Sequence, residues 1–259
     1  MSHRLHALET VDNFRDYGDY ATAAGRRLRA GKLFRSAHHG RASDEDLERI
    51  DALNLGVVVD LRRPGERRQH PSRRPAGFAA RVVQSEMDDG KEAPHITFLR
   101  ESDLTEESGR RFMSETYRAM PFDAAHVDLF SRYFRTLGDC EGAVLIHCAA
   151  GKDRTGLLAA LTHHLMGVVH EDMIEDYMLT NTAVDLVARA PQVSRQLEAF
   201  TGRRAAPEAV VAFLGVDPTF IEAAWSSIRE RSGSVDRYLN DVLGVDGGIR
   251  DRIEARLAA

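Results

Sequence analysis

A cysteine and an arginine six residues apart are the side chains whose types and spacing predict a covalent reaction. Cys148 follows the apolar run 143–146 and His147, and Arg154 opens the apolar segment that comes next. A thiol between a strand end and a helix start faces inward-pointing N–H groups and the positive end of the helix dipole. These surroundings stabilise the thiolate, which is the nucleophilic form of cysteine. The spacing therefore predicts that Cys148 is a nucleophile.

The residues that follow Cys148 suit a phosphate dianion. We expect the loop amides to surround the phosphate, and Gly151 lets the backbone come close to it. The planar guanidinium of Arg154 can hold two phosphate oxygens at once, which a lysine cannot do. The predicted phosphate-binding residues are Ala149, Ala150, Gly151, Lys152, Asp153 and Arg154.

Three further residues of this segment have predicted roles. The hydroxyl of Thr155 can hydrogen-bond the Cys148 thiolate or help to release it in the second half of a two-step reaction. We interpret His147 as ordering the loop through backbone hydrogen bonds rather than as a base. Lys152 is either a solvated loop lysine or a second cation for a second phosphate.

The segment 147–156, HCAAGKDRTG, matches the HCxxGxxR(S/T) signature of the cysteine-dependent protein tyrosine phosphatase superfamily. Its GKDRTG form resembles the bacterial tyrosine and phosphoinositide phosphatases. The resemblance covers most of the chain and is weakest over residues 85–120. The other similar segments are 13–16, 33–36, 59–62 with Glu66 and Pro71, 233–235, 238–239 and 243–244.

The resemblance implies an α/β fold with a central, mostly parallel sheet flanked by helices. The phosphate loop then lies at the carboxyl end of a strand, and a helical lid covers it. Together with the chain length it predicts a single phosphatase domain over residues 1–259. In this domain residues 85–120 are a lid insertion and residues 168–259 a helical C-terminal part.

The implied reaction is hydrolysis of a phosphomonoester in two steps. Cys148 attacks phosphorus in line, and water then hydrolyses the cysteinyl-phosphate, without a metal or another cofactor. The expected substrate is a phosphotyrosine protein, with dual-specificity or phosphoinositide activity as extensions. A tyrosyl leaving group, with a pKa of about 10, needs a general acid. Asp60, at a strand end, is the first candidate, although it could instead pair with Arg62 or Arg154. Asp153 is the second, although it could instead pair with Lys152 or Arg62.

Two other functions use similar residues. One is a non-catalytic module that binds phosphorylated residues, and the presence of both Cys148 and Arg154 argues against it because a binder needs no thiolate. The other is a rhodanese-type sulfurtransferase, which also has a cysteine loop after a strand. His147, Gly151 and Thr155 disfavour this second alternative.

Several side chains outside the loop have open roles. Cys140 is either structural or forms a reversible disulfide with Cys148. Arg35 and Ser36 either line the phosphate pocket or make ordinary hydrogen bonds at a strand end. The histidine pairs 38–39 and 163–164 lack metal-ligand spacing, so we expect no metal site.

The elements that must position these residues follow from hydrophobic spacing. Short apolar runs predict buried strands at 57–61, 81–83 and 143–146. Helical spacing predicts a helix capped by Ser43, one over 123–137 and one over 155–167. The predicted C-terminal helices are 170–187, 194–200, 207–214, 218–231, 234–243 and 248–257. Residues 85–120 show little periodicity.

Composition limits the remaining possibilities. The chain has 259 residues, 43% of them hydrophobic, and its 35 Lys and Arg against 40 Asp and Glu give a net charge of −5. This balance predicts no nucleic-acid groove. The presence of only two cysteines predicts a reducing compartment, so we expect a cytoplasmic protein. Export without a signal peptide remains an alternative. No run of about 18 apolar residues is present, which predicts no stable membrane insertion. The oligomeric state stays open.

Overall fold

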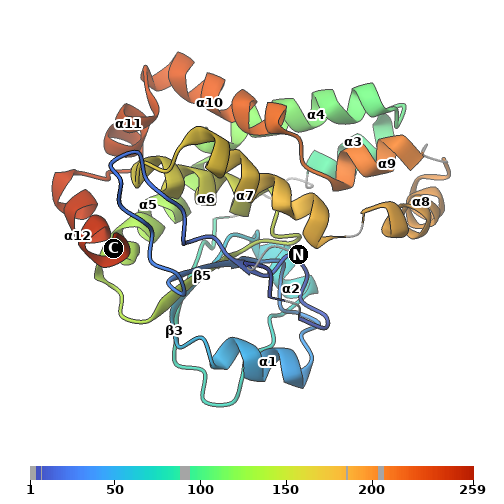
Figure 1. The fold of residues 1–259 in the computed structure, drawn as a ribbon. Helices are drawn as coiled ribbons and strands as arrows, with labels where there is room; N and C mark the ends of the chain where they lie inside the picture. The colour runs from blue at the N-terminus through green and yellow to red at the C-terminus, as the bar shows by residue number, and fades with distance from the viewer. Residues whose placement is uncertain (1–3, 7, 88–93, 185, 204–206) are drawn as a thin grey trace.

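The chain folds around a five-stranded sheet with helices on both faces (Figure 1). A computed structural model describes residues 4–6, 8–87, 94–184, 186–203 and 207–259. The strands are β1 (Arg15–Asp16), β2 (Leu33–Ser36), β3 (Leu55–Asp60), β4 (Arg81–Gln84) and β5 (Ala143–His147). Their order is β1-β2-β5-β3-β4; β1 is antiparallel to β2 and the other pairs are parallel. The predicted α/β class with a mostly parallel sheet is confirmed.

Helices make up most of the remaining chain. They are α1 (Asp44–Asp51), α2 (Pro64–Gln69), α3 (Pro94–Glu101), α4 (Glu106–Ala119), η1 (Met120–Phe122), α5 (Ala124–Asp139), α6 (Asp153–Leu165), α7 (His170–Ala183), α8 (Leu186–Thr201), α9 (Pro207–Leu214), α10 (Pro218–Ser232), α11 (Val235–Arg237), η2 (Tyr238–Val242) and α12 (Gly247–Leu257). The helices predicted over 207–214, 218–231 and 248–257 are confirmed to within one residue. Helix α7 ends four residues before the predicted 187, α8 begins eight residues before the predicted 194, and the predicted 234–243 helix is the short α11 followed by a π-helix.

Strand β5 lies at the centre of the sheet because its side chains are apolar on both faces. Val144 and Ile146 join the large core under α5 and α6, while Leu145 joins a smaller core beneath α1. All five β5 residues are buried. Alternating side chains of one strand therefore hold the two helical layers together, and the loop after β5 starts from a rigid base.

The predicted helix start at Ser43 is confirmed. Ser43 Oγ accepts a hydrogen bond of 3.2 Å from the backbone N–H of Asp46, and three acidic residues occupy the first turn of α1. The side chain satisfies an amide that has no partner within the helix, and the carboxylates oppose its dipole.

Residues 85–120 contain more helix than their weak periodicity indicates. Helix α4 packs along α10 (Figure 1), and its Met113 and Tyr117 are buried in the large core. Thr105 caps this helix by accepting a 3.2 Å hydrogen bond from the N–H of Ser108. Helix α4 therefore contributes to the core. The lid over residues 85–120 stays a prediction.

Helix α3 belongs to a third, smaller cluster together with α8 and α9. Its buried members are Leu99 of α3, Leu104, Ala190 of α8 and Val210 of α9. Segments from before and after the central strand thus meet beside the main core. Among the described residues, no helix combines the length and apolar character needed to cross a bilayer.

Candidate active site

Cys148 lies in the loop between β5 and α6, at the carboxyl edge of the parallel sheet. Ligands of open α/β sheets bind at this edge. The cysteine is buried, with 2% of its surface exposed. Gly151 has a φ of 68°, and a Cβ there would lie 2.4 Å from the carbonyl atoms of Ser36. The close approach of the loop to β2 therefore requires glycine.

Four consecutive carbonyl oxygens of the loop are bonded from the side of β1 and β2. The bonds run from His38 N to Ala149 O (3.2 Å), from Asn13 Nδ2 to Ala150 O (3.4 Å) and Gly151 O (2.8 Å), and from Arg35 Nη2 to Gly151 O (3.0 Å) and Lys152 O (3.5 Å). In a trans peptide the carbonyl and the next N–H point in opposite directions. The N–H groups of residues 150–153 therefore point to the other side of the loop, as an anion site requires.

Arg154 is anchored by a bidentate ion pair with Glu66 of α2. Its Nη1 and Nη2 lie 2.6 and 2.8 Å from the two carboxylate oxygens, and Nη1 also donates to Leu61 O at 3.1 Å. Burial lowers the pKa of Arg154, but Glu66 and Cys148 raise it more, and the net pKa lies above its usual value. The guanidinium is thus permanently charged and held in one orientation.

Thr155 and Gly156 place the first turn of α6. The hydroxyl of Thr155 is fully buried and has no hydrogen-bond partner among the described residues. It is therefore available to Cys148. A Cβ on Gly156 would lie 2.9 Å from the ring of Tyr177, so this glycine lets α7 pack closely against α6.

Asp60 ends β3 and is bound by Arg62. Its oxygens accept hydrogen bonds from Arg62 N (3.1 Å), Nε (2.9 Å) and Nη2 (2.6 Å). Burial raises the pKa of Asp60, but the nearby His147 ring and the hydrogen bonds from Arg62 lower it by a larger amount. The net pKa therefore lies well below its usual value. The carboxyl group is therefore an anion at neutral pH, in agreement with the pairing alternative for this residue.

Asp153 begins α6 and lies next to a buried phenol. Tyr117 of α4 donates a 3.0 Å hydrogen bond to Asp153 Oδ1 and accepts one of 2.7 Å from Tyr177. Burial raises the pKa of Tyr117 well above its usual value, so the phenol stays protonated. About a quarter of the Asp153 side chain (24%) is exposed. Lys152 Nζ lies 3.8 Å from the same Oδ1, so the carboxylate is oriented by a phenol and an ammonium group while part of it reaches solvent.

His147 is fully buried and stacks on His39, with ring centroids 5.0 Å apart. Burial lowers the pKa of His147 to about 4, so the imidazole is neutral at pH 7. Its ring nitrogens have no hydrogen-bond partner among the described residues, while its carbonyl accepts a 2.8 Å bond from Leu61 N. The prediction that His147 orders the loop holds for its backbone, while its ring packs on His39 and places Nε2 3.7 Å from Asp60 Oδ2.

Lys152 is neither a solvated lysine nor a free second cation. Its Nζ donates to the carbonyls of Phe213 (2.5 Å) and Gly215 (3.3 Å) at the C-terminal end of α9. Cations favour this end of a helix, where carbonyls lack intrahelical partners. Lys152 thus ties α9 to the loop through its side chain, and its backbone amide stays available to an anion.

The side chain of Arg35 contacts the loop, whereas that of Ser36 hydrogen-bonds residues beside its own strand. The Arg35 side chain is fully buried and binds the loop carbonyls from below. Ser36 Oγ donates to Ala37 O at 2.8 Å and lies 3.0 Å from His39 Nε2. The strand-end interpretation is thus correct for Ser36, whereas Arg35 supports the loop.

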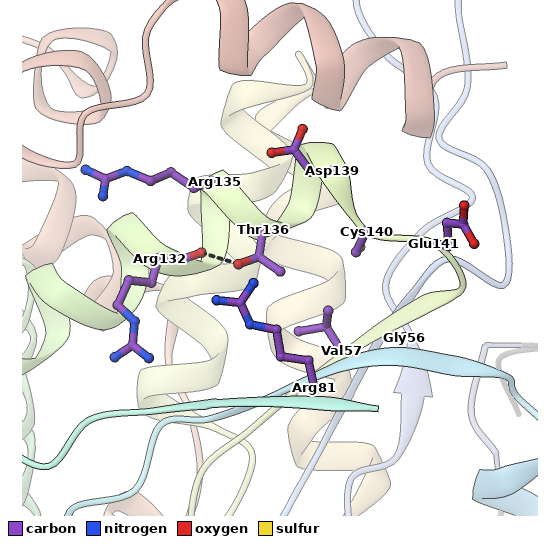
Figure 2. A pocket seen from close by; sticks show the side chains of 9 residues that line it. All are labelled: Gly56, Val57, Arg81, Arg132, Arg135, Thr136, Asp139, Cys140 and Glu141. Carbon is purple, nitrogen blue, oxygen red and sulfur yellow. Dashed lines mark hydrogen bonds between the residues drawn. The ribbon is translucent and has the colours of Figure 1, made fainter. Parts of the chain in front are cut away.

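A disulfide between Cys140 and Cys148 is incompatible with the fold. Cys140 precedes β5 and Cys148 follows it, so a five-residue strand separates them. At about 3.3 Å per residue this spacing greatly exceeds the ~7 Å limit between bridged Cα atoms. Cys140 lines a 540 Å³ pocket at the opposite edge of the sheet (Figure 2). In this pocket the Arg81 side chain points towards Thr136, whereas the side chains of Arg132 and Arg135 point away from Thr136.

Several contributors to the site lie outside the predicted set. Asn13 and Glu66 belong to the similar segments but had no predicted role, and Tyr117 lies in the segment without visible periodicity. Pro64 followed by Glu66 is a helix-start pattern and would have indicated α2. Nothing local in the sequence indicates that Tyr117 meets Asp153, because the contact depends on the packing of α4.

Comparisons with known proteins agree with this geometry. A protein of Cupriavidus necator, whose name places it among the tyrosine-protein phosphatases, is 35% identical over 243 residues, covering 93% of this chain and 84% of that protein. The triple specificity protein phosphatase PtpB of Mycobacterium tuberculosis is 31% identical over 257 residues, which cover 88% of this chain and 90% of that protein. The solved structure of Pseudomonas aeruginosa TpbA matches 74% of this chain and 94% of its own at 16% identity and a TM-score of 0.31. Because this TM-score is low, the family assignment rests on the sequence matches alone.

The model of the tyrosine phosphatase family matches residues 6–259, which include every element around Cys148. With the two relatives above 30% identity, this match covers the loop, both helical layers and the C-terminal helices. The chain therefore belongs to the tyrosine phosphatase family and is a phosphatase.

Proposed function

We propose that this phosphatase hydrolyses phosphotyrosine through a cysteinyl-phosphate on Cys148. The main support is the orientation of the loop, whose carbonyls are held by Asn13, Arg35 and His38 so that its amides face the opposite side together. Preorganised N–H groups of this kind stabilise the charge that builds up on phosphoryl oxygens. Arg154, held by Glu66, supplies the fixed positive charge.

In the first step the Cys148 thiolate forms the S–P bond as the bond from phosphorus to the ester oxygen breaks. The leaving oxygen takes a proton from a carboxylic acid. In the second step water attacks phosphorus and returns a proton to that carboxylate, while the S–P bond breaks and the thiolate is restored. The unpartnered hydroxyl of Thr155 can stabilise the departing thiolate.

We assign the general acid to Asp153 rather than Asp60. Three hydrogen bonds from Arg62 hold Asp60 as an anion, which makes it a poor proton donor. Asp153 adjoins the loop, is partly exposed and accepts a hydrogen bond from Tyr117. Its position lets it exchange a proton with both the leaving group and water.

A pocket of 200 Å³ beside Arg154 supports an aromatic substrate. Its apolar walls include Leu61, Pro64, Met87 and Leu129, and His126 lies at its edge. The carbonyl of Leu61 is bonded to Arg154, which links this pocket to the phosphate site. The buried imidazole of His126 is neutral at pH 7, because burial lowers its pKa to about 4. The lining also includes Arg62, Arg63 and Asp123, so the pocket offers an apolar wall to a phenyl ring and charged groups to the peptide around it.

Phosphoserine, phosphothreonine and phosphoinositide activity are further proposals. Their support is the name of the mycobacterial relative, a triple specificity phosphatase. The free second cation expected for a doubly phosphorylated head group is not provided by Lys152, whose Nζ binds α9. A panel of phosphopeptides and phosphoinositides compares these substrates directly.

The decisive test of the proposal is hydrolysis of p-nitrophenyl phosphate by Cys148→Ser. A serine hydroxyl is almost entirely protonated at neutral pH, so we expect kcat to fall by at least about 10³-fold. The matched control is Cys140→Ser, which removes the other thiol at the far end of β5 and should keep the wild-type rate. If Cys148→Ser retains most of the rate, the covalent mechanism is wrong. Production of thiocyanate from thiosulfate and cyanide would favour the sulfurtransferase instead.

A further inference from the structure

A cluster of buried charges lies beneath the loop. Arg15 of β1 and Arg35 of β2 are paired across the antiparallel strands, and neither is exposed to solvent. Both bind the carboxylate of Asp176 on α7, with Arg15 Nε 3.0 Å from Oδ1 and Arg35 Nη1 2.6 Å from Oδ2. Arg15 also donates to the Asp176 carbonyl at 2.9 Å. One carboxylate thus joins two strands to a helix.

The same two arginines reach the loop. Arg35 donates to the carbonyls of Gly151 and Lys152 through Nη2, the nitrogen that Asp176 does not bind. Arg15 donates to Asn13 Oδ1, and the amide nitrogen of Asn13 donates to Gly151 O. Both paths therefore lead from Asp176 to the carbonyl side of the loop, opposite the amides that face a phosphate.

The charges of this cluster do not cancel. Two guanidinium groups share one carboxylate, so Arg15, Arg35 and Asp176 carry a net charge of +1 in the interior. A buried charge without compensation is costly, and anions above the loop would compensate it. Negative charge on Cys148 and on a bound phosphate is therefore favoured by this cluster as well as by Arg154.

We propose that Asp176 is a positioning residue of the phosphatase reaction. It clamps Arg15 and Arg35, which hold the loop carbonyls, and it thereby aims the loop amides at the phosphoryl group. This inference rests on the proposed function, because it assigns the phosphate to the amide side of the loop. A merely structural ion pair would join β1, β2 and α7 but would leave anion affinity unchanged.

The test compares Asp176→Asn with wild type in two measurements. Calorimetric titration with tungstate, a tetrahedral dianion, reports the loop geometry without any reaction. Steady-state hydrolysis of p-nitrophenyl phosphate separates kcat from KM. Asparagine keeps the shape but not the charge, so the two arginines lose their shared anion, repel each other and no longer hold the loop carbonyls in place. The added positive charge by itself favours an anion, so a fall in affinity reports the lost positioning of the amides. We expect tungstate affinity to fall at least about tenfold and kcat to fall about 10- to 100-fold, as expected for misplaced transition-state donors.

The control and a second variant separate positioning from folding. Tyr238→Phe removes a buried hydrogen bond to Pro121 O far from the loop and should destabilise the protein while leaving tungstate affinity unchanged. Arg35→Lys keeps the charge, but its single nitrogen cannot bridge Asp176 and Gly151 as the guanidinium does. It should reproduce the loss of affinity even if Asp176→Asn does not fold.

The outcomes distinguish this inference from the proposed function. If Arg35→Lys and any folded Asp176→Asn bind tungstate within twofold of the wild type, and kcat is equally unchanged, the positioning role is overturned while the phosphatase mechanism stands. If Cys148→Ser remains active but Asp176→Asn loses tungstate affinity, the covalent mechanism fails and the positioning of the loop stands. If wild type neither binds tungstate nor hydrolyses the ester, both fail.

Discussion

At the scale of single residues, the environment of each carboxylate decides which one can transfer a proton. Asp60 and Asp153 both lie near the loop, but their partners differ. Asp60 accepts three hydrogen bonds from one arginine and is 2% exposed. Asp153 accepts one from a neutral phenol, has Lys152 Nζ at the longer distance of 3.8 Å, and reaches solvent. An acid that must give up and regain a proton in each cycle needs the second environment.

We predict that Asp153→Asn and Asp60→Asn differ most on poor leaving groups. For phenyl phosphate, Asp153→Asn should lower kcat by about 10²- to 10³-fold, because phenolate then leaves without a proton. The loss should be smaller for p-nitrophenyl phosphate, whose leaving group is less basic. Asp60→Asn should keep the wild-type ratio of the two rates and lower the free energy of unfolding. An unchanged ratio in Asp153→Asn would exclude it as the acid.

At the scale of elements, each side of the loop is held by a different part of the chain. Strands β1 and β2 hold its carbonyls, α2 holds Arg154 through Glu66, and α9 receives the side chain of Lys152. The contact with α9 differs from the others because it joins the loop to the small cluster of α3, α8 and α9 outside the main core. Elements in small clusters open locally at lower free energy than core elements.

We predict that Lys152→Met loosens α9 without unfolding the protein. The change removes the hydrogen bonds to the carbonyls of Phe213 and Gly215 but keeps an apolar stem against the Phe213 ring. Hydrogen exchange followed by mass spectrometry should be at least about fivefold faster at amides 208–216 and unchanged in β5. Lys152→Arg, which keeps a charged donor, is the matched control. Equal exchange in all three proteins would show that Lys152 does not hold α9.

At the scale of the whole molecule, several histidines are buried as neutral groups. His39 and His147 stack on each other, His163 contacts the carbonyl of Tyr17, and His126 stacks on Phe130 within α5. Burial lowers the pKa of each of them, to about 4 for His126 and His147. In the unfolded chain the same groups titrate near 6.5.

This predicts a loss of stability on acidification. Between pH 6.5 and about 4 the unfolded chain binds protons that the folded protein does not, so the free energy of unfolding falls as pH falls. For His147 alone, the pKa difference from 6.5 to about 4 corresponds to about 3 kcal/mol. Urea unfolding from pH 8 to 4.5 measures the slope, which should be near zero above pH 7.

Two variants assign this slope. His126→Gln should make the decline shallower, because one buried imidazole is removed. His170→Gln is the matched control, because it removes a half-exposed imidazole at the surface. A free energy of unfolding that is constant from pH 7 to 5 would contradict the burial of neutral histidines.

The sequence by itself determined the parts of this protein whose chemistry is local. Cys148, the glycine turn, Arg154 and Thr155 follow one another within a strand, a loop and a helix start, and the periodicity around them indicates those elements. Most helices after residue 168 were visible for the same reason, because local spacing indicates them, although the start of α8 was not. Only the tertiary structure decided which distant side chains hold the loop. Glu66, Tyr117 and Asp176 reach it from α2, α4 and α7. Their contacts depend on helix packing, which no short segment encodes, and α4 itself was missed because polar residues mask its narrow buried stripe.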